Sequence, residues 1–266
     1  MDRLDVEVRL RSEDRSPAST GWVIGSVERR YLTTLLPLSP RLALKGQSLD
    51  GERLILSVEN AHELEIELEL LNRWLFGLGV WSRWRDERLA LWVSDWSRAL
   101  GTIERSAARF WGVWTEGAHC NGYVCNPSGR PERLWIARRA ASRPVDPGLL
   151  DNLIGCGVAA TESPQDAMLR ESWEEAGLQP ECLRGIRAAA VRDVIRVTEG
   201  GGLHRQRIHI FDLALDRQRT PVNQDGEVDS FSLMSIGAVI RALAAGQFAA
   251  DAAFVTRDFL VRHGLD

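Results

Sequence analysis

Apolar residues recur at helical spacing in the first half of the chain, at positions 64, 66, 68, 71 and 75. This pattern predicts a helix over residues 62–76, because positions three and four apart share one face of a helix. Shorter apolar runs predict strands over residues 21–24, 53–58 and 89–93, and the pattern over residues 103–111 predicts a short helix. Glu65, Glu67 and Glu69 are interpreted as a solvated helix face and not as a metal site.

In the second half, residues 119–125 and 134–138 flank the turn sequence Asn126-Pro127-Ser128-Gly129, which predicts a hairpin. Further expected elements are a short strand over 150–154, strands over 188–197 and 207–215 with a flexible Glu199-Gly200-Gly201-Gly202 tip, and helices over 235–245 and 253–263. This order of strands and helices favours the α/β (α+β) class. We expect a small N-terminal α+β domain over residues 1–114 and a second domain over residues 115–266.

A helix is also predicted over residues 165–176, because its flanks carry the signals of a helix start and stop. Thr161 or Ser163 can cap the start, Pro164 suits the first turn, and Gly177 suits a left-handed residue after the last turn. On this helix Leu169, Trp173 and Ala176 share one face, which we expect to pack on a core.

The opposite face of the same helix carries three carboxylates, Glu171, Glu174 and Glu175. Residues at i, i+3 and i+4 lie close together, so these negative charges repel one another unless a cation lies between them. Hard carboxylate oxygens are the ligands preferred by Mg²⁺ or Mn²⁺. The spacing therefore predicts a metal site, with a solvated acidic helix face as the alternative.

The composition adds little to the predicted fold, but it limits the classes of binding partner that we expect. The chain has 266 residues, of which 44% are hydrophobic and 26% charged, with a net charge of -4. We therefore expect neither nucleic acid nor a membrane as a partner. The four cysteines lack metal-site spacing, and the charged N-terminus lacks the apolar stretch of a signal peptide. Free thiols in a cytoplasmic protein are the expected state.

Residues 155–178 resemble the signature of the Nudix hydrolases, G-x5-E-x7-R-E-U-x-E-E-x-G-U, where U is aliphatic. The matching residues are Glu162, Arg170, Glu171, Glu174, Glu175, Gly177 and Leu178. The first glycine of the signature falls on Cys156, which Gly155 and Gly157 flank, and its first aliphatic position falls on Ser172. The resemblance implies a Nudix α/β/α sandwich with a mixed sheet. Gly155, Glu162, Arg170 and Gly177 would then be structural or orienting residues.

Other stretches resemble one Nudix subgroup, which carries an extra N-terminal domain and is also found fused to thiamine pyrophosphokinase in fungi. These stretches are TEGAHCNGYV, LWIARRAASRPVDPGLLDNL, FDLAL, DGEVDSF and DFLVRHGL. The resemblance implies Mg²⁺-dependent (or Mn²⁺-dependent) hydrolysis of thiamine diphosphate or its damaged analogues, with release of phosphate. Two alternatives stay open, a pyrophosphatase for substrates such as ADP-ribose or NADH and a non-catalytic ligand-binding protein.

The expected reaction assigns roles to individual residues. Glu171, Glu174 and Glu175 are the expected metal ligands and catalytic groups. Glu227, in the Asp-Gly-Glu-Val turn with Asp225 behind it, is the candidate general base, and a box glutamate is the alternative. Arg139, at the end of a predicted strand, is a candidate for substrate phosphate. The N-terminal domain is expected either to shape the substrate pocket or to build a homodimer.

Overall fold

The computed structural model describes residues 2–10, 21–45, 52–198 and 200–266. The chain divides into two compact units. Unit 1 comprises Met1–Glu116 with Asp193–Arg207, and unit 2 comprises Gly117–Arg192 with Ile208–Asp266. The boundary at residues 114 and 115 stays a prediction for independently folding domains, and Glu199 of the predicted flexible tip lies outside the described residues.

Unit 1 is built on a four-stranded sheet of order β2-β1-β4-β3. Its strands are β1 (Arg3–Leu10), β2 (Trp22–Glu28), β3 (Leu42–Lys45) and β4 (Arg53–Val58). Strand β1 runs antiparallel to β2 and parallel to β4, and β3 runs antiparallel to β4. The short η2 (Arg29–Tyr31), α1 (Leu32–Leu35) and η3 (Leu36–Leu38) follow β2. The prediction of a strand over residues 53–58 is confirmed.

Helix α2 (Ala61–Gly77) confirms the helix predicted from the apolar spacing, and the Asn60 side chain caps its first turn. It buries Leu64, Leu68, Leu71 and Leu75 in a core shared with β1 and β4. The antiparallel pair β5 (Arg88–Trp92) and β6 (Ala99–Glu104) follows, and then α3 (Ala108–Trp111). The helix predicted over residues 103–111 is therefore wrong in its first half, because buried Ile103 and Glu104 pair with β5.

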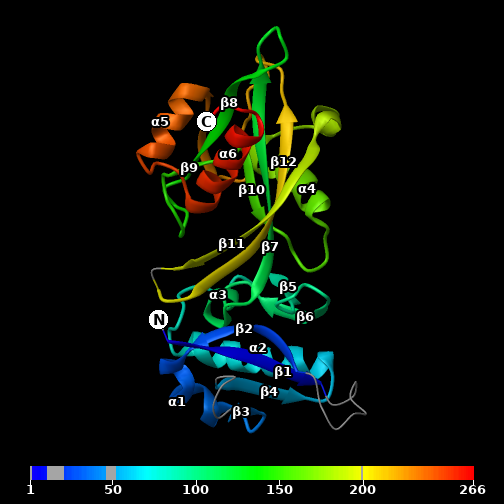
Figure 1. The fold of residues 1–266 in the computed structure, drawn as a ribbon, viewed down its shortest axis with the longest axis vertical. Helices are drawn as coiled ribbons and strands as arrows, with labels where there is room; N and C mark the ends of the chain where they lie inside the picture. The colour runs from blue at the N-terminus through cyan, green and yellow to red at the C-terminus, as the bar shows by residue number, and fades with distance from the viewer. Residues whose placement is uncertain (1, 11–20, 46–51, 199) are drawn as a thin grey trace. The chain divides into compact units, whose positions relative to one another are not determined.

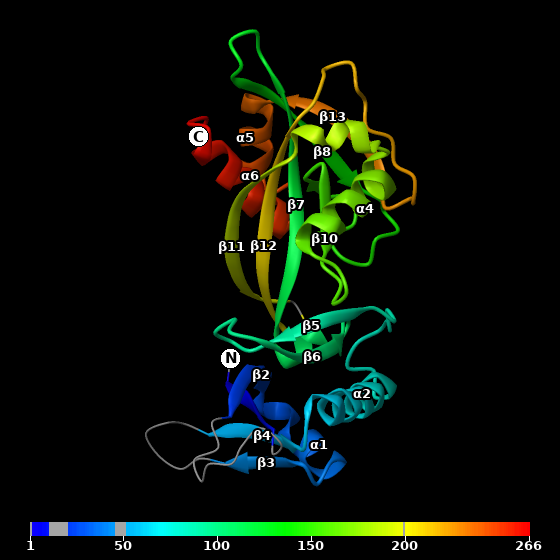
Figure 2. The same cartoon turned by 90° about the vertical axis from the view of Figure 1, so that its right-hand side faces the viewer.

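Unit 2 is a sheet with helices on both faces, as Figures 1 and 2 show. Its strands are β7 (Trp114–Cys125), β8 (Pro131–Arg139), β9 (Leu150–Asp151), β10 (Ile154–Gly157), β11 (Arg187–Val197), β12 (Leu203–Ala214) and β13 (Val228–Ser235), of which β7, β11 and β12 also contribute residues to unit 1. Helix α4 (Pro164–Ala176), which η4 (Pro180–Gly185) follows, covers one face. Helices α5 (Ile236–Ala244) and α6 (Ala250–Arg262) cover the other. The predicted α/β/α sandwich is confirmed.

The strand pairing of unit 2 brings distant parts of the chain together. The predicted hairpin is confirmed, since β7 and β8 pair antiparallel with Gly122 opposite Trp135. Strand β10 pairs with β7, and β13 pairs with β8, with Gly155 opposite His119 and Val228 opposite Arg139. Strand β13 was not predicted. No helix among the described residues is long and apolar enough to cross a membrane.

The two ends of α4 form as the sequence predicts. The Ser163 hydroxyl accepts a hydrogen bond from the Asp166 N–H, and the Asp166 carboxylate accepts from Ser163, which makes a capping box at the helix start. Gly177 ends the helix in the left-handed conformation, with φ of 62°. The Leu178 N–H then reaches the Ser172 carbonyl at 2.9 Å, so the last turn is closed.

The face that α4 buries includes Ala176, as predicted, but the prediction is wrong for Leu169 and Trp173. The buried residues are Ala167, Met168, Ser172, Glu175 and Ala176, whereas Leu169 is 42% exposed and Trp173 is 47% exposed. The helix is therefore turned by about 100°, one residue step, from the expected orientation. Small side chains at 167, 172 and 176 let the helix backbone approach the sheet closely, and this leaves the two large apolar side chains at the rim.

Gly177→Ala should lower the free energy of unfolding by about 2–3 kcal/mol, because the change combines two costs. Its φ disfavours any side chain, and a Cβ would lie 2.6 Å from the Val222 carbonyl oxygen. Gly246→Ala is the matched control, since it has a similar φ of 66° but no atom within 4 Å of the added Cβ, and it should cost only about 1 kcal/mol. Urea unfolding measures both, and equal losses would show that the Val222 contact does not matter.

Candidate active site

Arg170 lies at the centre of a network of ion pairs on α4. Its Nη2 and Nε donate to the two carboxylate oxygens of Glu162, at 2.8 and 3.2 Å, which makes a bidentate pair. Its Nη1 donates to Glu171 at 2.8 Å and to Glu174 at 3.0 Å. One guanidinium thus holds three carboxylates, as expected for an orienting residue.

Glu162 ties this network to the loop that precedes the helix. Its carboxylate accepts a hydrogen bond from the Ala159 N–H at 3.0 Å as well as the bonds from Arg170. Burial acts to raise the pKa of Glu162, but the bonds from Arg170 and Ala159 outweigh burial and hold that pKa below its usual value. The ionised form of Glu162 is therefore the form that the fold favours.

Glu175 is the innermost carboxylate of the site. It is 7% exposed, and its Oε2 accepts a hydrogen bond from the Gly155 N–H at 2.9 Å. Burial raises the pKa of Glu175 well above its usual value, and the neighbouring Glu171 carboxylate raises it further. Burial likewise raises the pKa of Glu171, although Arg170 opposes this effect. Two carboxylates therefore lie in an environment that favours a nearby positive charge.

The surroundings of Gly155 leave little room for a side chain. A Cβ at this position would lie 3.0 Å from the His119 ring and 3.2 Å from Asp151 Oδ1. The His119 ring is itself fixed, because its Nδ1 lies 2.9 Å from Asn152 Oδ1 in the buried interior. The close approach of these groups keeps the Gly155 N–H directed at Glu175.

The two departures from the Nudix signature are accommodated locally. Cys156 lies in strand β10 opposite Ala118, with an ordinary extended backbone that does not require glycine. Burial raises the pKa of the Cys156 thiol well above its usual value, which disfavours the nucleophilic thiolate. Ser172 is fully buried, and its hydroxyl donates to the Met168 carbonyl at 2.6 Å. Neither residue disturbs the carboxylate face.

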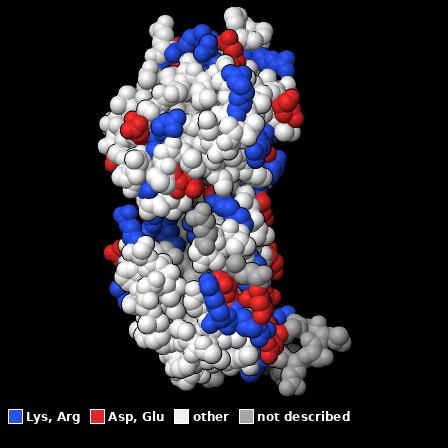
Figure 3. Space-filling view, turned by 90° about the vertical axis from the view of Figure 1, so that its left-hand side faces the viewer, with Lys and Arg blue, Asp and Glu red and all other residues white. Residues whose placement is uncertain are grey.

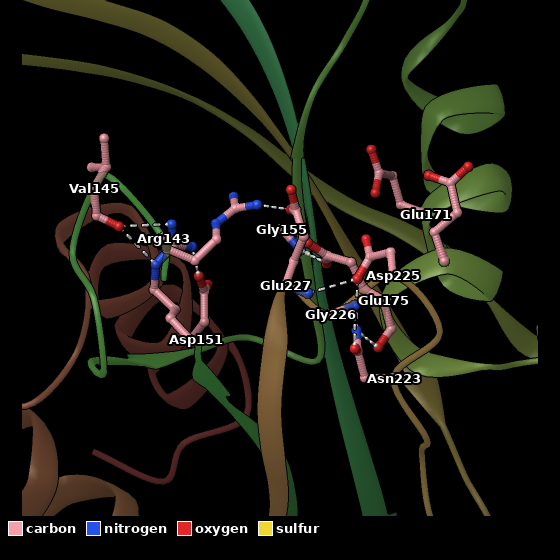
Figure 4. A network of polar contacts seen from close by, with 12 residues as sticks. Arg143, Val145, Asp151, Gly155, Glu171, Glu175, Asn223, Asp225, Gly226 and Glu227 are labelled. Carbon is pink, nitrogen blue, oxygen red and sulfur yellow. Dashed lines mark hydrogen bonds and ion pairs between the residues drawn. The ribbon is translucent and has the colours of Figure 1, made fainter. Parts of the chain in front are cut away.

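A loop and a turn face the carboxylates of α4 (Figure 4). Arg143, whose side chain is 17% exposed, forms an ion pair with Glu227, whose side chain is 43% exposed. Asp225 Oδ1 accepts from the Glu227 N–H at 2.8 Å and from the Asn223 side chain at 2.7 Å, which fixes the turn. Arg143 also lies near enough to Glu175 to oppose the rise of its pKa. The site therefore contains an arginine opposite the acidic helix.

The Arg139 guanidinium is engaged by groups of the protein itself. Its Nη1 donates to Asp151 at 2.6 Å, and its Nε and Nη2 donate to the Val145 carbonyl at 3.2 and 2.9 Å. These bonds fasten the loop that carries Arg143 to the end of strand β8. Arg139 thus supports this loop in the described structure.

The donor set suits a hard divalent cation in its chemistry, because Glu171, Glu174 and Glu175 supply only carboxylate oxygens. The arrangement is not a preassembled metal site. Among the described residues, no three His, Cys, Asp or Glu side chains are grouped so that they could hold a metal ion as they stand. Arg170 instead donates hydrogen bonds to Glu171 and Glu174. Its guanidinium therefore neutralises part of the negative charge that a metal cation would otherwise neutralise.

Sequence reasoning missed Arg143 and Asp151 as parts of this site. Both lie before the signature, and neither has a spacing to it that indicates contact. The pairing of β8 with β9 and β13 brings both residues to the site. In this pairing Ala137 lies opposite Asp151, and Val228 lies opposite Arg139. The only available signal was a run of arginines followed by Asp-Pro-Gly, which is typical of a loop at a strand end.

Comparison with known proteins gives matches of two kinds. Residues 118–257 match the model of the NUDIX domain. The uncharacterized protein YJR142W of Saccharomyces cerevisiae is 33% identical over 192 residues, which cover 68% of this chain and 56% of the relative. Nudix hydrolase 20, chloroplastic, of Arabidopsis thaliana is 34% identical over 167 residues, which cover 61% and 43%. The chain thus spans about half the length of these curated relatives.

Among solved structures, the crystal structure of DR0079 from Deinococcus radiodurans aligns with 64% of this chain and 98% of that protein. The sequence identity is 22% and the TM-score is 0.47.

Glu162→Gln should lower the free energy of unfolding by about 0.5–1 kcal/mol at pH 7, because it removes the charge that Arg170 clamps in partly screened surroundings. The folded-state pKa of Glu162 lies below its unfolded value, so its stabilisation is complete above the unfolded pKa and is lost as the pH falls through the folded one. The two proteins should therefore converge in urea unfolding once the pH falls below the folded-state pKa of Glu162, which lies below the usual value for a glutamate. Glu181→Gln, at an exposed site, is the control, and a loss that is independent of pH would contradict the ion-pair explanation.

Proposed function

The chain belongs to the NUDIX domain family, and we propose that it is a hydrolase that cleaves the phosphoric anhydride of a small diphosphate. The observation that carries this proposal is the position of Glu175. Its buried carboxylate lies beside Glu171 and faces Arg143 across the site. A fold that keeps acidic side chains in such surroundings loses stability unless a cation compensates them. This cost is expected at a functional site.

Glu171, Glu174 and Glu175 are the proposed ligands of Mg²⁺, with Mn²⁺ as a substitute. A bound divalent cation supplies charge neutralisation at the diphosphate oxygens and makes a water molecule easier to deprotonate. Arg170 forms ion pairs with Glu171 and Glu174. Its bidentate pair with Glu162 does not depend on those two bonds, so Arg170 stays fixed when they are given up.

Arg143 is the proposed ligand of the substrate phosphates. Its guanidinium offers several donors in a fixed plane, which suits phosphate oxygens. In the free protein its charge is balanced by Glu227. A bound diphosphate competes for the same guanidinium, and this competition would release the Glu227 carboxylate into the site. Arg139, through its bonds to Asp151 and Val145, would position the loop and contact substrate only secondarily.

Glu227 is the proposed general base that takes the proton from the attacking water. Its partial exposure and its turn, fixed by Asp225, leave the carboxylate accessible beside Arg143. A glutamate of α4 is the alternative base. In either case the water attacks phosphorus, the anhydride P–O bond breaks, and the leaving phosphate takes the electron pair.

The substrate class within diphosphates rests on the sequence resemblance to the subgroup related to thiamine pyrophosphokinase fusions. We therefore propose thiamine diphosphate or its damaged analogues, with phosphate as a product.

The charge distribution on the surface also agrees with a small-molecule partner. On the face drawn in Figure 3, basic and acidic side chains are interspersed with uncharged surface. That distribution differs from the basic stripe of a nucleic-acid-binding protein. The four cysteines are unpaired, which suits the proposed cytoplasmic location.

Phosphate release from a panel of diphosphates tests the proposal. The panel contains thiamine diphosphate, its oxidised analogues, ADP-ribose and NADH, each assayed with Mg²⁺, Mn²⁺ or a chelator. Metal-dependent release that is fastest on the thiamine compounds is the expected result. ADP-ribose cleavage, detected after a phosphatase is added, would retain the chemistry and replace the substrate. Inactivity across the panel, with no metal-induced rise in melting temperature, would indicate a non-catalytic protein.

Glu174→Gln should reduce kcat by roughly 10²–10³-fold, because it removes one negative ligand of the cation. The same variant should lose most of the rise in melting temperature that millimolar Mg²⁺ gives the unaltered protein. Glu181→Gln, which lies outside the site, should change neither quantity. Normal Mg²⁺ stabilisation in Glu174→Gln would contradict the ligand assignment even if activity falls.

Arg143→Gln should raise KM by roughly 10–100-fold, because charge-assisted hydrogen bonds to phosphate are lost. Its effect on Mg²⁺-induced stabilisation should be small. Arg138→Gln is the matched control, since Arg138 is an exposed arginine near the end of β8, before the loop that carries Arg143, and donates to the Gly148 carbonyl at 2.7 Å. An equal change in both variants would show that Arg143 has no special role in binding.

A further inference from the structure

Residues 222–224, which lead into the turn of Glu227, close the last turn of α4. The final carbonyl groups of a helix have no partner within the helix itself. Here the Val222 N–H donates to the Ala176 carbonyl at 2.9 Å, and the Gln224 N–H donates to the carbonyl of residue 174 at 3.0 Å. The segment is therefore attached to the end of α4 by its main chain.

The Asn223 side chain joins this attachment to the turn itself (Figure 4). Its Nδ2 donates to the Glu175 carbonyl at 3.4 Å and to Asp225 Oδ1 at 2.7 Å. Its Oδ1 accepts a hydrogen bond from the Gly226 N–H at 2.6 Å. One planar amide group thus bonds to the helix and to two residues of the turn.

The backbone of Glu227 is held through the same groups. Its N–H donates to Asp225 Oδ1 at 2.8 Å, so Asn223 and Glu227 bond to one carboxylate oxygen. The Glu227 carbonyl accepts from the Ala140 N–H at 2.9 Å, next to the end of β8. Two side chains, Asn223 and Asp225, therefore connect the main chain of Glu227 to that of Glu175.

A local turn explains part of this arrangement but not all of it. The bond from the Gly226 N–H to the Asn223 side chain is of the kind that asparagine makes within many turns. The bond to the Glu175 carbonyl reaches a different element, 48 residues earlier in the chain. An asparagine can make both because its amide supplies a donor and an acceptor at once.

We propose that Asn223 is a positioning residue that fixes Glu227 relative to the carboxylates of α4. This inference rests on the proposed function, in which Glu175 holds the cation and Glu227 takes the proton from the attacking water. A base and a metal ligand from separate elements must keep their relative position to within roughly 0.5 Å. The link through Asn223 supplies this constraint, because it joins the main chains of the two residues.

Asn223→Ala should lower kcat by roughly 10–100-fold and change KM by less than about twofold, because the base is misplaced while the substrate ligands remain. The rates are measured with Mg²⁺ on the diphosphate of the panel that is hydrolysed fastest. Gln224→Ala is the matched control and should change neither constant, since the Gln224 side chain donates to the Val222 carbonyl of its own segment at 2.7 Å. Asn223→Asp keeps the acceptor for Gly226 but loses the donor, and a normal kcat in this variant would overturn the proposed link to α4.

A double variant separates positioning of the base from a general loss of structure. If Asn223 acts through Glu227, Asn223→Ala should have little further effect on kcat in a Glu227→Gln background. Equal losses in both backgrounds would overturn the inference. A normal kcat in Glu227→Gln alone would also overturn it, but the metal-ligand assignment of the proposed function would stand.

Amide hydrogen exchange gives a readout that needs no turnover. The N–H groups of Gly226 and Glu227 should exchange at least roughly 10-fold faster in Asn223→Ala and at an unaltered rate in Gln224→Ala. The rise in melting temperature with Mg²⁺ should persist in Asn223→Ala, because the carboxylates of α4 are retained. Unaltered exchange would overturn the inference even in an active hydrolase. Faster exchange in a protein that hydrolyses no diphosphate would support the link and contradict the proposed function alone.

Discussion

The burial of the Glu175 carboxylate against the Gly155 N–H is the constraint on which the candidate site depends. A buried carboxylate is costly without compensation, and here one hydrogen bond and nearby Arg143 supply only part of it. To bring Glu175 inward, α4 must turn its small residues to the sheet, and Leu169 and Trp173 are left at the rim. The helix orientation is therefore set by a polar contact and not by the burial of its largest apolar side chains.

The site contains two arginines, and they differ in how firmly the protein holds them. Arg170 is held by the bidentate pair with Glu162, and this pair also ties down the loop before α4 through Ala159. Arg143 lies in a loop, and its ion-pair partner Glu227 is a partly exposed carboxylate on a turn. A rigid arginine suits the ordering of acidic ligands, and one with an exchangeable partner suits a ligand that comes and goes.

Helix α2 of unit 1 and helix α4 of unit 2 place their acidic side chains in opposite ways. In unit 2 an acidic side chain is drawn into the interior, whereas on α2 the acidic side chains are drawn to the flanks and apolar ones are left outside. In both helices, specific ion pairs and hydrogen bonds override the simple rule that apolar residues face inward. The departure in unit 2 occurs where we infer a reaction centre, and departures of this kind are expected at such places.

Sequence patterns alone predict the existence, limits and caps of α4, the spacing of its carboxylates, the length of α2 and the hairpin of β7 and β8. These features depend on interactions among residues a few positions apart, so periodicity and capping signals suffice for them. The rotation of α4 and the placement of Arg143 and Glu227 opposite it follow from tertiary packing. They depend on strand register and on which partners the neighbouring elements present, and such long-range contacts leave no periodic trace in the chain.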